Sequence, residues 1–223
     1  MKETKRIIKE KNIIDAAIVI FGEVGFKNAK MEDIAKVAGI TKVTLYAYFQ
    51  SKENLYMAVT FRALTELNQM YEHTVSENKT KNGLESTMML FEGFMSFFEA
   101  NFLFSEVLLE YFSLIRSTSS GKNEARLTEA IRESSYFQRL QGIHNLPFKL
   151  TAREIERGKK DGSIKNSRDP MLLTLYGWTC VLGYLKVLAA SGGGMIPLFK
   201  FNIQELRKLH IQNARALFTV AVS

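Results

Sequence analysis

The chain is poor in the residues that mark disulfide-rich, loop-rich and secreted proteins. Its 223 residues include one cysteine, Cys180, which excludes an intramolecular disulfide and is typical of proteins in a reducing cytoplasm. Three prolines and 14 glycines are few for a loop-rich β fold. The opening residues, MKETKRIIKEKNIID, contain no continuous apolar segment of the kind found in secretory signals. These absences argue against a loop-rich β fold, and we expect a protein located in the cytoplasm.

Long hydrophobic runs are also scarce. The most apolar stretch is uncharged from Pro170 to Leu185 and is then interrupted by Lys186. It falls short of the roughly 20 apolar residues that a membrane-spanning helix needs, and no comparable stretch accompanies it. We expect a helix that protein covers on most of its faces, and no membrane partner.

Residue groupings that carry catalysis or bind metals are missing. The three histidines lie at none of the spacings that bind zinc, and no glycine-rich phosphate loop is present. Cys180 lies within the apolar stretch, which favours a small buried side chain over a nucleophile. Glu85, Glu92 and Glu99 recur every seven residues opposite an apolar stripe, which favours a solvated helix face over an acid–base site. We expect no enzyme, no metal and no cofactor.

The net charge of +7 and the isoelectric point near 9.4 permit binding to a polyanion, although anionic membranes attract basic proteins as well. A first helix is predicted from about Thr4 to Val24, with a lysine-rich start that favours nearby phosphates and with Gly25 closing it. Its predicted buried stripe comprises Ile7, Ile14, Ala17, Ile18 and Phe21.

The segment from Lys30 to Lys52 reads as two short helices joined by a tight turn. Met31, Ile34, Ala35 and Ala38 follow helical spacing and line one apolar face. Gly39 is expected to end the first helix in the left-handed conformation, and Thr41 to cap the second. Leu45 and Phe49, one turn apart, then face inward.

The outward surface of the second helix carries hydroxyls, one cation and small apolar groups, but no carboxylate. Such a surface suits phosphates and base edges, as in the recognition helices of helix-turn-helix proteins. Its residues are Thr41, Lys42, Val43, Thr44, Tyr46, Ala47 and Tyr48.

The stretch FGEVGFKNAKMEDIAKVAGITKVTLYAYFQSKENL resembles the TetR family of bacterial transcriptional regulators. The likeness lies in the aromatic-Gly pair, the Asp-Ile-Ala and Ala-Gly of the first short helix and turn, the Thr-Leu-Tyr-x-Tyr-Phe of the second, and the Ser-Lys-Glu-x-Leu that follows. It covers about the first quarter of the chain. Lys30 stands where the family usually carries a Ser or Thr cap, and Val43 where glycine is common.

The resemblance, together with the helical spacing along the chain, implies an all-α protein with a three-helix DNA-binding head and a larger C-terminal helical domain for ligand binding and dimerisation. We expect the head in residues 1–50, a connecting helix and linker in 51–82 and the helical domain in 83–223. Lys42 is predicted to contact a base edge and Val43 a thymine methyl. Contacts to DNA are further expected from Lys30, Thr41, Thr44, Tyr46, Ala47, Tyr48 and Lys52.

Two further sets of residues are candidates within the C-terminal part. A ligand pocket is predicted from aromatic and methionine side chains, although each also suits an ordinary core: Phe91, Phe94, Met95, Phe98, Phe112, Trp178 and Tyr184. A homodimer interface is predicted on the helices at about 170–190 and 203–222, whose small residues admit a neighbouring helix: Gly177, Cys180 and Gly183, with Leu182, Leu206 and Leu217.

These features predict a regulator that binds a pseudo-palindromic operator in double-stranded DNA as a homodimer, most simply a repressor released by a small apolar or aromatic effector. Two alternatives remain at this point. An accessory DNA-binding protein would bind DNA without any effector, and a helical enzyme or carrier with a vestigial head would show no sequence-specific DNA affinity.

Overall fold

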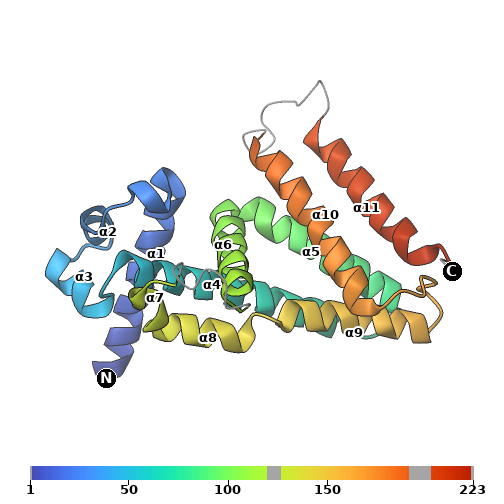
Figure 1. Ribbon diagram of the computed structural model, residues 1–223, viewed down its shortest axis with the longest axis horizontal. Helices are drawn as coiled ribbons and strands as arrows, with labels where there is room; N and C mark the ends of the chain where they lie inside the picture. The colour runs from blue at the N-terminus through green and yellow to red at the C-terminus, as the bar shows by residue number, and fades with distance from the viewer. Residues whose placement is uncertain (1, 120–126, 191–201, 222–223) are drawn as a thin grey trace. The chain divides into compact units, whose positions relative to one another are not determined.

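The computed structural model describes residues 2–119, 127–190 and 202–221, and every regular element within them is a helix (Figure 1). The all-α prediction is therefore confirmed. The elements are α1 (Lys2–Asn28), α2 (Met31–Val37), α3 (Lys42–Tyr48), α4 (Lys52–Glu77), α5 (Gly83–Ala100), α6 (Phe102–Ser119), α7 (Glu129–Arg132), α8 (Ser135–Ile143), α9 (Leu146–Lys160), α10 (Pro170–Ala190) and α11 (Ile203–Thr219).

The helices form two compact units. The first unit contains residues 1–65 and 102–143, and the second contains residues 66–101 and 144–223. Helix α4 contributes its first half to one unit and its second half to the other. The boundaries of these units differ from those of the expected segments 1–50, 51–82 and 83–223. The division into those three functional segments stays a prediction.

The core of the first unit includes the inward faces of α1, α2 and α3. Phe21 of α1, Ile34 of α2 and Leu45 of α3 are at most 1% exposed. Gly25 adopts a φ of 73° and interrupts the helical backbone of α1, in line with its predicted closing role. Ile7 differs from prediction: it is 62% exposed, so the buried stripe of α1 does not extend to its first turns.

Helix α4 follows its predicted apolar series. Ser51 accepts a hydrogen bond from the backbone N–H of Asn54 at 3.1 Å, as expected of an N-cap. Its predicted apolar residues are all buried: Leu55, Val59, Leu64, Leu67 and Tyr71.

In the second unit, α5 packs closely on α9. A Cβ atom at Gly83 would lie 2.0 Å from the backbone nitrogen of Gly158, so the two helices meet where only glycine fits. The start of α5 is held by Asp161, whose carboxylate accepts from the Gly83 N–H at 2.7 Å. That N–H belongs to the first turn of α5 and has no partner within its own helix.

The acids of α5 do not form the simple solvated face that their spacing predicts. Glu85 pairs with Arg215 of α11 at 2.7 Å, and Glu99 accepts from Tyr184 at 2.6 Å and from Arg207 at 3.1 Å. Only Glu92 is exposed as expected. The sequence did not indicate these pairs, because α11, which supplies both arginines, is more than 100 residues away in sequence from α5.

Helix α10 is the most apolar element. Among the described residues, Pro170–Ala189 is one helix with the length and apolarity to cross a membrane, and 39% of that stretch is buried within the chain. Length therefore does not exclude a membrane span, contrary to the sequence argument, but core helices of soluble proteins also meet this criterion. Asp169 caps the helix by accepting from the backbone N–H groups of Met171 and Leu172.

Candidate nucleic-acid interface

The turn between α2 and α3 is built as the sequence predicts. Lys30 precedes α2 in extended conformation and makes no side-chain cap, so the start of α2 lacks the hydrogen bond that Ser or Thr would provide. Gly39 has a φ of 65°, and the Ile40 N–H donates to the carbonyl of Ala35 at 3.0 Å. A left-handed residue followed by this hydrogen bond closes the helix and sets the direction of α3.

Thr41 begins α3 by capping it. Its hydroxyl oxygen accepts from the Thr44 N–H at 3.1 Å and lies 2.9 Å from the Thr44 hydroxyl. A phosphate contact by either hydroxyl stays a prediction.

Leu45 and Phe49 anchor α3, with 0% and 1% of their surfaces exposed. Anchoring on this side leaves the opposite side to solvent: Val43 is 81% exposed, and Lys42, Tyr46 and Ala47 are exposed as well. Thr44 and Tyr48 are half-buried at the edges. The structure therefore presents the predicted surface as one exposed face, which is the geometry that a groove-binding helix requires.

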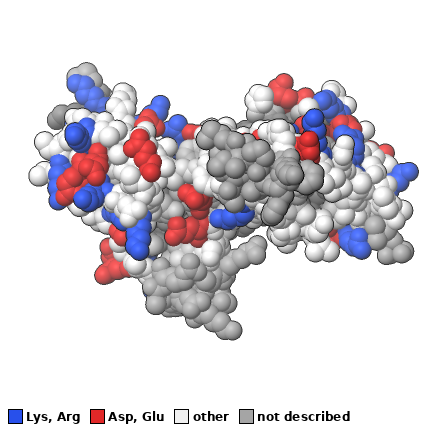
Figure 2. Space-filling model, turned by 90° about the horizontal axis from the view of Figure 1, so that it is seen from above, with Lys and Arg blue, Asp and Glu red and all other residues white. Residues whose placement is uncertain are grey.

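Lys42, the one basic residue of α3, is already paired with an acidic side chain. Its ammonium donates to the carboxylate of Glu32 on α2 and lies 5.9 Å from the centre of the Tyr46 ring. The hydrogen bond raises the pKa of Lys42 and lowers the pKa of Glu32. Figure 2 likewise shows basic and acidic side chains side by side at the α2–α3 end, without an unbroken basic face in this view.

Lys52 has a structural position that sequence reasoning missed. Its ammonium donates to the backbone carbonyls of Phe26, Lys27 and Ala29 at 2.7, 3.2 and 3.0 Å, and it lies 4.6 Å from the Phe26 ring centre. An ammonium has three donors, so all three are engaged. The signal was the closing glycine of α1, because the carbonyls at a helix end attract cations. A phosphate contact by Lys52 stays a prediction.

Most predicted pocket residues pack against one another. The Phe94 ring lies 4.8 Å from Phe98 and 5.2 Å from Trp178, and Trp178 lies 4.4 Å from Phe148. Phe94, Met95, Phe98 and Tyr184 are at most 3% exposed. This arrangement is that of an aromatic core in the second unit. Phe112, which is half-buried, belongs to the first unit.

Phe91 is the predicted pocket residue that reaches a cavity. A cavity of about 300 Å³ lies between α5, α10 and α11 in the second unit. Its walls contain apolar groups, the His210 imidazole and an amide: Phe91, Tyr176, Gly177, Cys180, His210, Asn213, Ala214, Leu217 and Phe218. We call it the α10–α11 cavity. Burial lowers the pKa of His210 against the opposing effect of a hydrogen bond to the backbone of Cys180.

The candidate dimer residues divide into two groups. A Cβ atom at Gly177 would lie 2.0 Å from Cζ of Phe91, so the absence of a side chain there serves packing within the chain rather than approach of a partner. The space at Gly177 is therefore occupied within the chain, and its role in a dimer stays a prediction. Gly183 is exposed, with open space around it. Leu182, Leu206, Cys180 and Leu217 are half-buried.

An exposed stripe on α10 was not identified from sequence. Its members follow a spacing of three and four residues, which places them on one helical face: Leu172, Leu175, Tyr176, Thr179, Gly183 and Val187. Leu172 and Tyr176 are each 54% exposed, which is unusual for large apolar side chains on a well-covered helix.

Groups of three or more His, Cys, Asp or Glu suited to a metal are absent from the described residues.

Comparison with known proteins finds sequence likeness in the N-terminal part of the chain. Residues 13–59 match the model of the family described as bacterial regulatory proteins, tetR family. The chain is 47% identical over 51 residues to the HTH-type transcriptional regulator RutR of Escherichia coli K12, a match that covers 23% of this chain and 24% of RutR. It is 33% identical over 81 residues to the negative transcriptional regulator IcaR of Staphylococcus aureus Newman, covering 36% and 42%.

These sequence matches span about a quarter of RutR and less than half of IcaR. The fold likeness extends further. The structure of the transcriptional regulator FadR from Bacillus subtilis, in complex with stearoyl-CoA, aligns with a TM-score of 0.63 at 17% identity, covering 96% of this chain and 99% of FadR. At this identity the alignment shows a shared fold and no more.

Proposed function

Because residues 13–59 make this chain a member of the tetR family of bacterial regulatory proteins, we propose that it represses transcription by binding a pseudo-palindromic DNA operator as a homodimer. The observation that carries the proposal is the exposed face of α3. It has no carboxylate of its own, is anchored by Leu45 and Phe49, and presents Lys42, Val43 and Tyr46 to solvent. Repression is supported by the likeness to IcaR, which is a negative transcriptional regulator.

In the proposed complex, α3 lies in the major groove. Lys42 leaves Glu32 and donates to guanine O6 or N7, while Val43 packs on a thymine methyl. Lys30, Thr41, Thr44, Tyr46 and Tyr48 contact phosphates around that base contact and Ala47 lies against the groove wall, as their positions along and beside α3 allow. We propose that Lys52 acts indirectly, by fixing the end of α1 through its hydrogen bonds to the backbone carbonyls there.

A second copy of the chain is the proposed cover for the exposed stripe of α10. Two copies related by a two-fold axis place identical faces against each other, so one apolar stripe is its own partner. Leu182, Gly183, Cys180, Leu206 and Leu217 are then at or beside the interface. Two recognition helices spaced by about 34 to 36 Å would read half-sites one turn of DNA apart.

The proposed effector is a small apolar or aromatic compound that binds in the second unit. Phe91 supports this location, because it belongs both to the apolar face of α5 and to the α10–α11 cavity. The FadR complex with stearoyl-CoA supports a ligand with an apolar part for this fold, because its stearoyl chain is apolar whereas its CoA half is anionic. We propose that the aromatic core rearranges around such a ligand, which concerns Phe94, Met95, Phe98, Trp178 and Tyr184. Phe112, in the first unit, is proposed to change its packing when the ligand binds. Movement of α4, which belongs to both units, would transmit binding to the head.

The test is capture of fragmented bacterial DNA with the purified full-length protein, followed by measurement of affinity for the enriched sequence. We expect a pseudo-palindrome and a loss of sequence preference of at least about tenfold in Lys42→Ala. Lys208→Ala, which removes an exposed lysine from α11, is the matched control and should retain the preference. Enrichment of no sequence would refute the proposal.

A screen of apolar compounds against the protein–operator complex separates the repressor from an accessory DNA-binding protein. Release of DNA by a compound supports the effector role, and linkage requires that DNA weaken binding of that compound by the same factor. Compounds that bind the second unit without changing DNA affinity would favour the accessory protein.

A further inference from the structure

A second cavity lies wholly within the first unit, and it is lined neither by α3 nor by residues of the α10–α11 cavity. It measures about 370 Å³ and is bounded by α1, α4 and α8. Its lining residues are Ile7, Glu10, Lys11, Ile14, Ala58, Phe61, Arg62, Thr65, Tyr136 and Arg139. We call it the α1–α4–α8 groove. Its volume is at the lower end of the range found for small-molecule sites.

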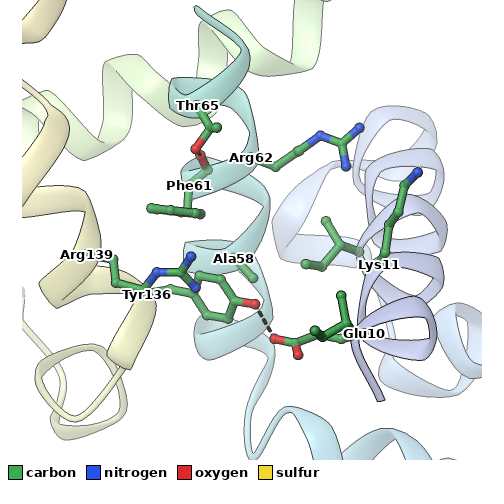
Figure 3. A pocket seen from close by; sticks show the side chains of 10 residues that line it. Glu10, Lys11, Ala58, Phe61, Arg62, Thr65, Tyr136 and Arg139 are labelled. Carbon is green, nitrogen blue, oxygen red and sulfur yellow. Dashed lines mark hydrogen bonds between the residues drawn. The ribbon is translucent and has the colours of Figure 1, made fainter. Parts of the chain in front are cut away.

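The charges around the groove are unbalanced. Lys11, Arg62 and Arg139 contribute three cations against the single carboxylate of Glu10. That carboxylate accepts a hydrogen bond from the Tyr136 hydroxyl, which orients it toward Tyr136 (Figure 3). Arg62 also lies 4.0 Å from Asp15, outside the lining. The lining itself therefore favours an anion.

One of the arginines is held in place before any ligand arrives. The guanidinium carbon of Arg139 lies 4.0 Å from the centre of the Phe61 ring and 5.1 Å from that of Tyr136. Stacking on two rings restricts the guanidinium plane, and a restricted guanidinium loses less entropy when it binds a carboxylate with two parallel hydrogen bonds. Figure 3 shows Arg139, Phe61 and Tyr136 on one side of the groove, with Lys11 and Arg62 on the other.

The remaining wall is apolar and incompletely covered. Ile7 lines the groove yet is 62% exposed, although its place on the apolar stripe of α1 predicts burial. Ile14, Ala58 and Phe61 extend the same apolar wall. Thr65 adds little polarity, because its hydroxyl donates to the Phe61 carbonyl at 2.8 Å. A ligand with an apolar body would complete the burial of Ile7.

From these observations we infer that the α1–α4–α8 groove binds a small amphipathic carboxylate. The carboxylate lies between Arg139 and the Lys11–Arg62 side, and the apolar body lies against Ile7, Ile14 and Phe61. This site is independent of the proposed repressor function, since it requires neither DNA nor the α10–α11 cavity. A ligand here would contact α1, α4 and α8 at once.

The probe for this inference is 2-naphthoate, titrated by calorimetry into the full-length protein without DNA. Its neutral analogue 2-naphthalenemethanol has the same ring system without the charge. We expect saturable binding of naphthoate that is at least about tenfold tighter than binding of the alcohol. Equal affinity for both compounds would overturn the role of the cations.

Two pairs of variants locate the site. Arg139→Gln should weaken naphthoate binding by about tenfold or more, whereas Arg153→Gln, which removes an exposed arginine of α9, should leave it unchanged. Ile7→Gln should weaken binding by about fivefold, whereas Ile8→Gln, a neighbour that is 55% exposed and lies outside the lining, should not. Thermal melts establish that each variant is folded, and Arg139→Lys provides a charge-retaining variant. Unchanged affinity in both Arg139→Gln and Ile7→Gln, or an equal loss in their controls, would place naphthoate elsewhere and refute the inference.

Discussion

At the scale of single residues, the pair of Lys42 and Glu32 links the two helices of the DNA-binding motif. Both side chains are about half exposed, and each shifts the pKa of the other toward its charged form. The carboxylate therefore competes with DNA for the only cation of α3, and it also brings a negative charge close to phosphates.

Glu32→Gln is expected to bind the operator more tightly, by about two- to tenfold at low salt, because Lys42 is then released and a repulsive charge is lost. Fluorescence anisotropy at several salt concentrations measures the change. Glu72→Gln, which removes an exposed acid of α4, is the control. Weaker binding by Glu32→Gln would show instead that Glu32 orients Lys42 for DNA.

Lys52 provides a second residue-scale prediction. Lys52→Met removes three hydrogen bonds to the end of α1, and we expect a loss of roughly 1 to 3 kcal/mol in the free energy of unfolding. Chemical denaturation measures this loss, with Lys79→Met at an exposed position as control. A different result would contradict the structural role. If stability is retained and the slope of log affinity against log salt concentration falls by about one, the value for one lost phosphate contact, then Lys52 contacts DNA.

At the scale of elements, α10 is shaped by its neighbours α5 and α11. Gly177 lets the Phe91 ring reach its backbone, whereas Gly183 faces open space on the same helix. The two glycines therefore form a natural comparison between packing inside the chain and packing across an interface.

Gly177→Ala should destabilise the chain by about 1 to 3 kcal/mol, because the new methyl group overlaps Phe91. Gly183→Ala should leave thermal stability of the dissociated chain unchanged or raise it, by up to about 1 kcal/mol, since alanine favours helix. Thermal unfolding at low protein concentration measures both. Similar losses in the two variants would contradict this account of α10.

The contact of α11 with α10 is predicted to respond to acid through His210. Burial lowers its pKa in the folded chain below the usual 6.5, so the unfolded chain takes up the proton first as pH falls. Its stabilising contribution is therefore present above about pH 6.5 and is lost below it. The melting temperature should fall between pH 7.5 and pH 5.5, and His210→Gln should reduce that fall. His73→Gln, at an exposed histidine of α4, should not.

At the scale of the whole molecule, the exposed stripe of α10 bears on the proposed homodimer. Of the apolar stretch of α10, 39% is buried within the chain, and the proposed self-association would cover the exposed stripe without a second component. The same stretch would satisfy a membrane by length, so the oligomeric state distinguishes the two possibilities.

Light scattering at micromolar concentration is expected to show a particle of about twice 25.4 kDa, free of detergent. Leu172→Glu, which introduces a charge at the first residue of the exposed stripe, should shift the particle toward 25.4 kDa while circular dichroism stays helical. Lys165→Glu, at an exposed position before α10, is the control. A wild-type particle of 25.4 kDa would exclude the dimer.

Local sequence alone was sufficient for the helical class, for the turn at Gly39, for the cap at Thr41 and for the anchors Leu45 and Phe49, because helical periodicity, glycine conformation and capping act within a few residues. Tertiary structure alone decided that Lys42 pairs with Glu32, that Lys52 holds the end of α1, that Gly177 accommodates Phe91, and that Arg139 stacks beside Glu10 and Ile7 in one groove. Each of these contacts joins residues on different helices, 10 to more than 100 positions apart, and helical spacing carries no information about which faces of distant helices meet.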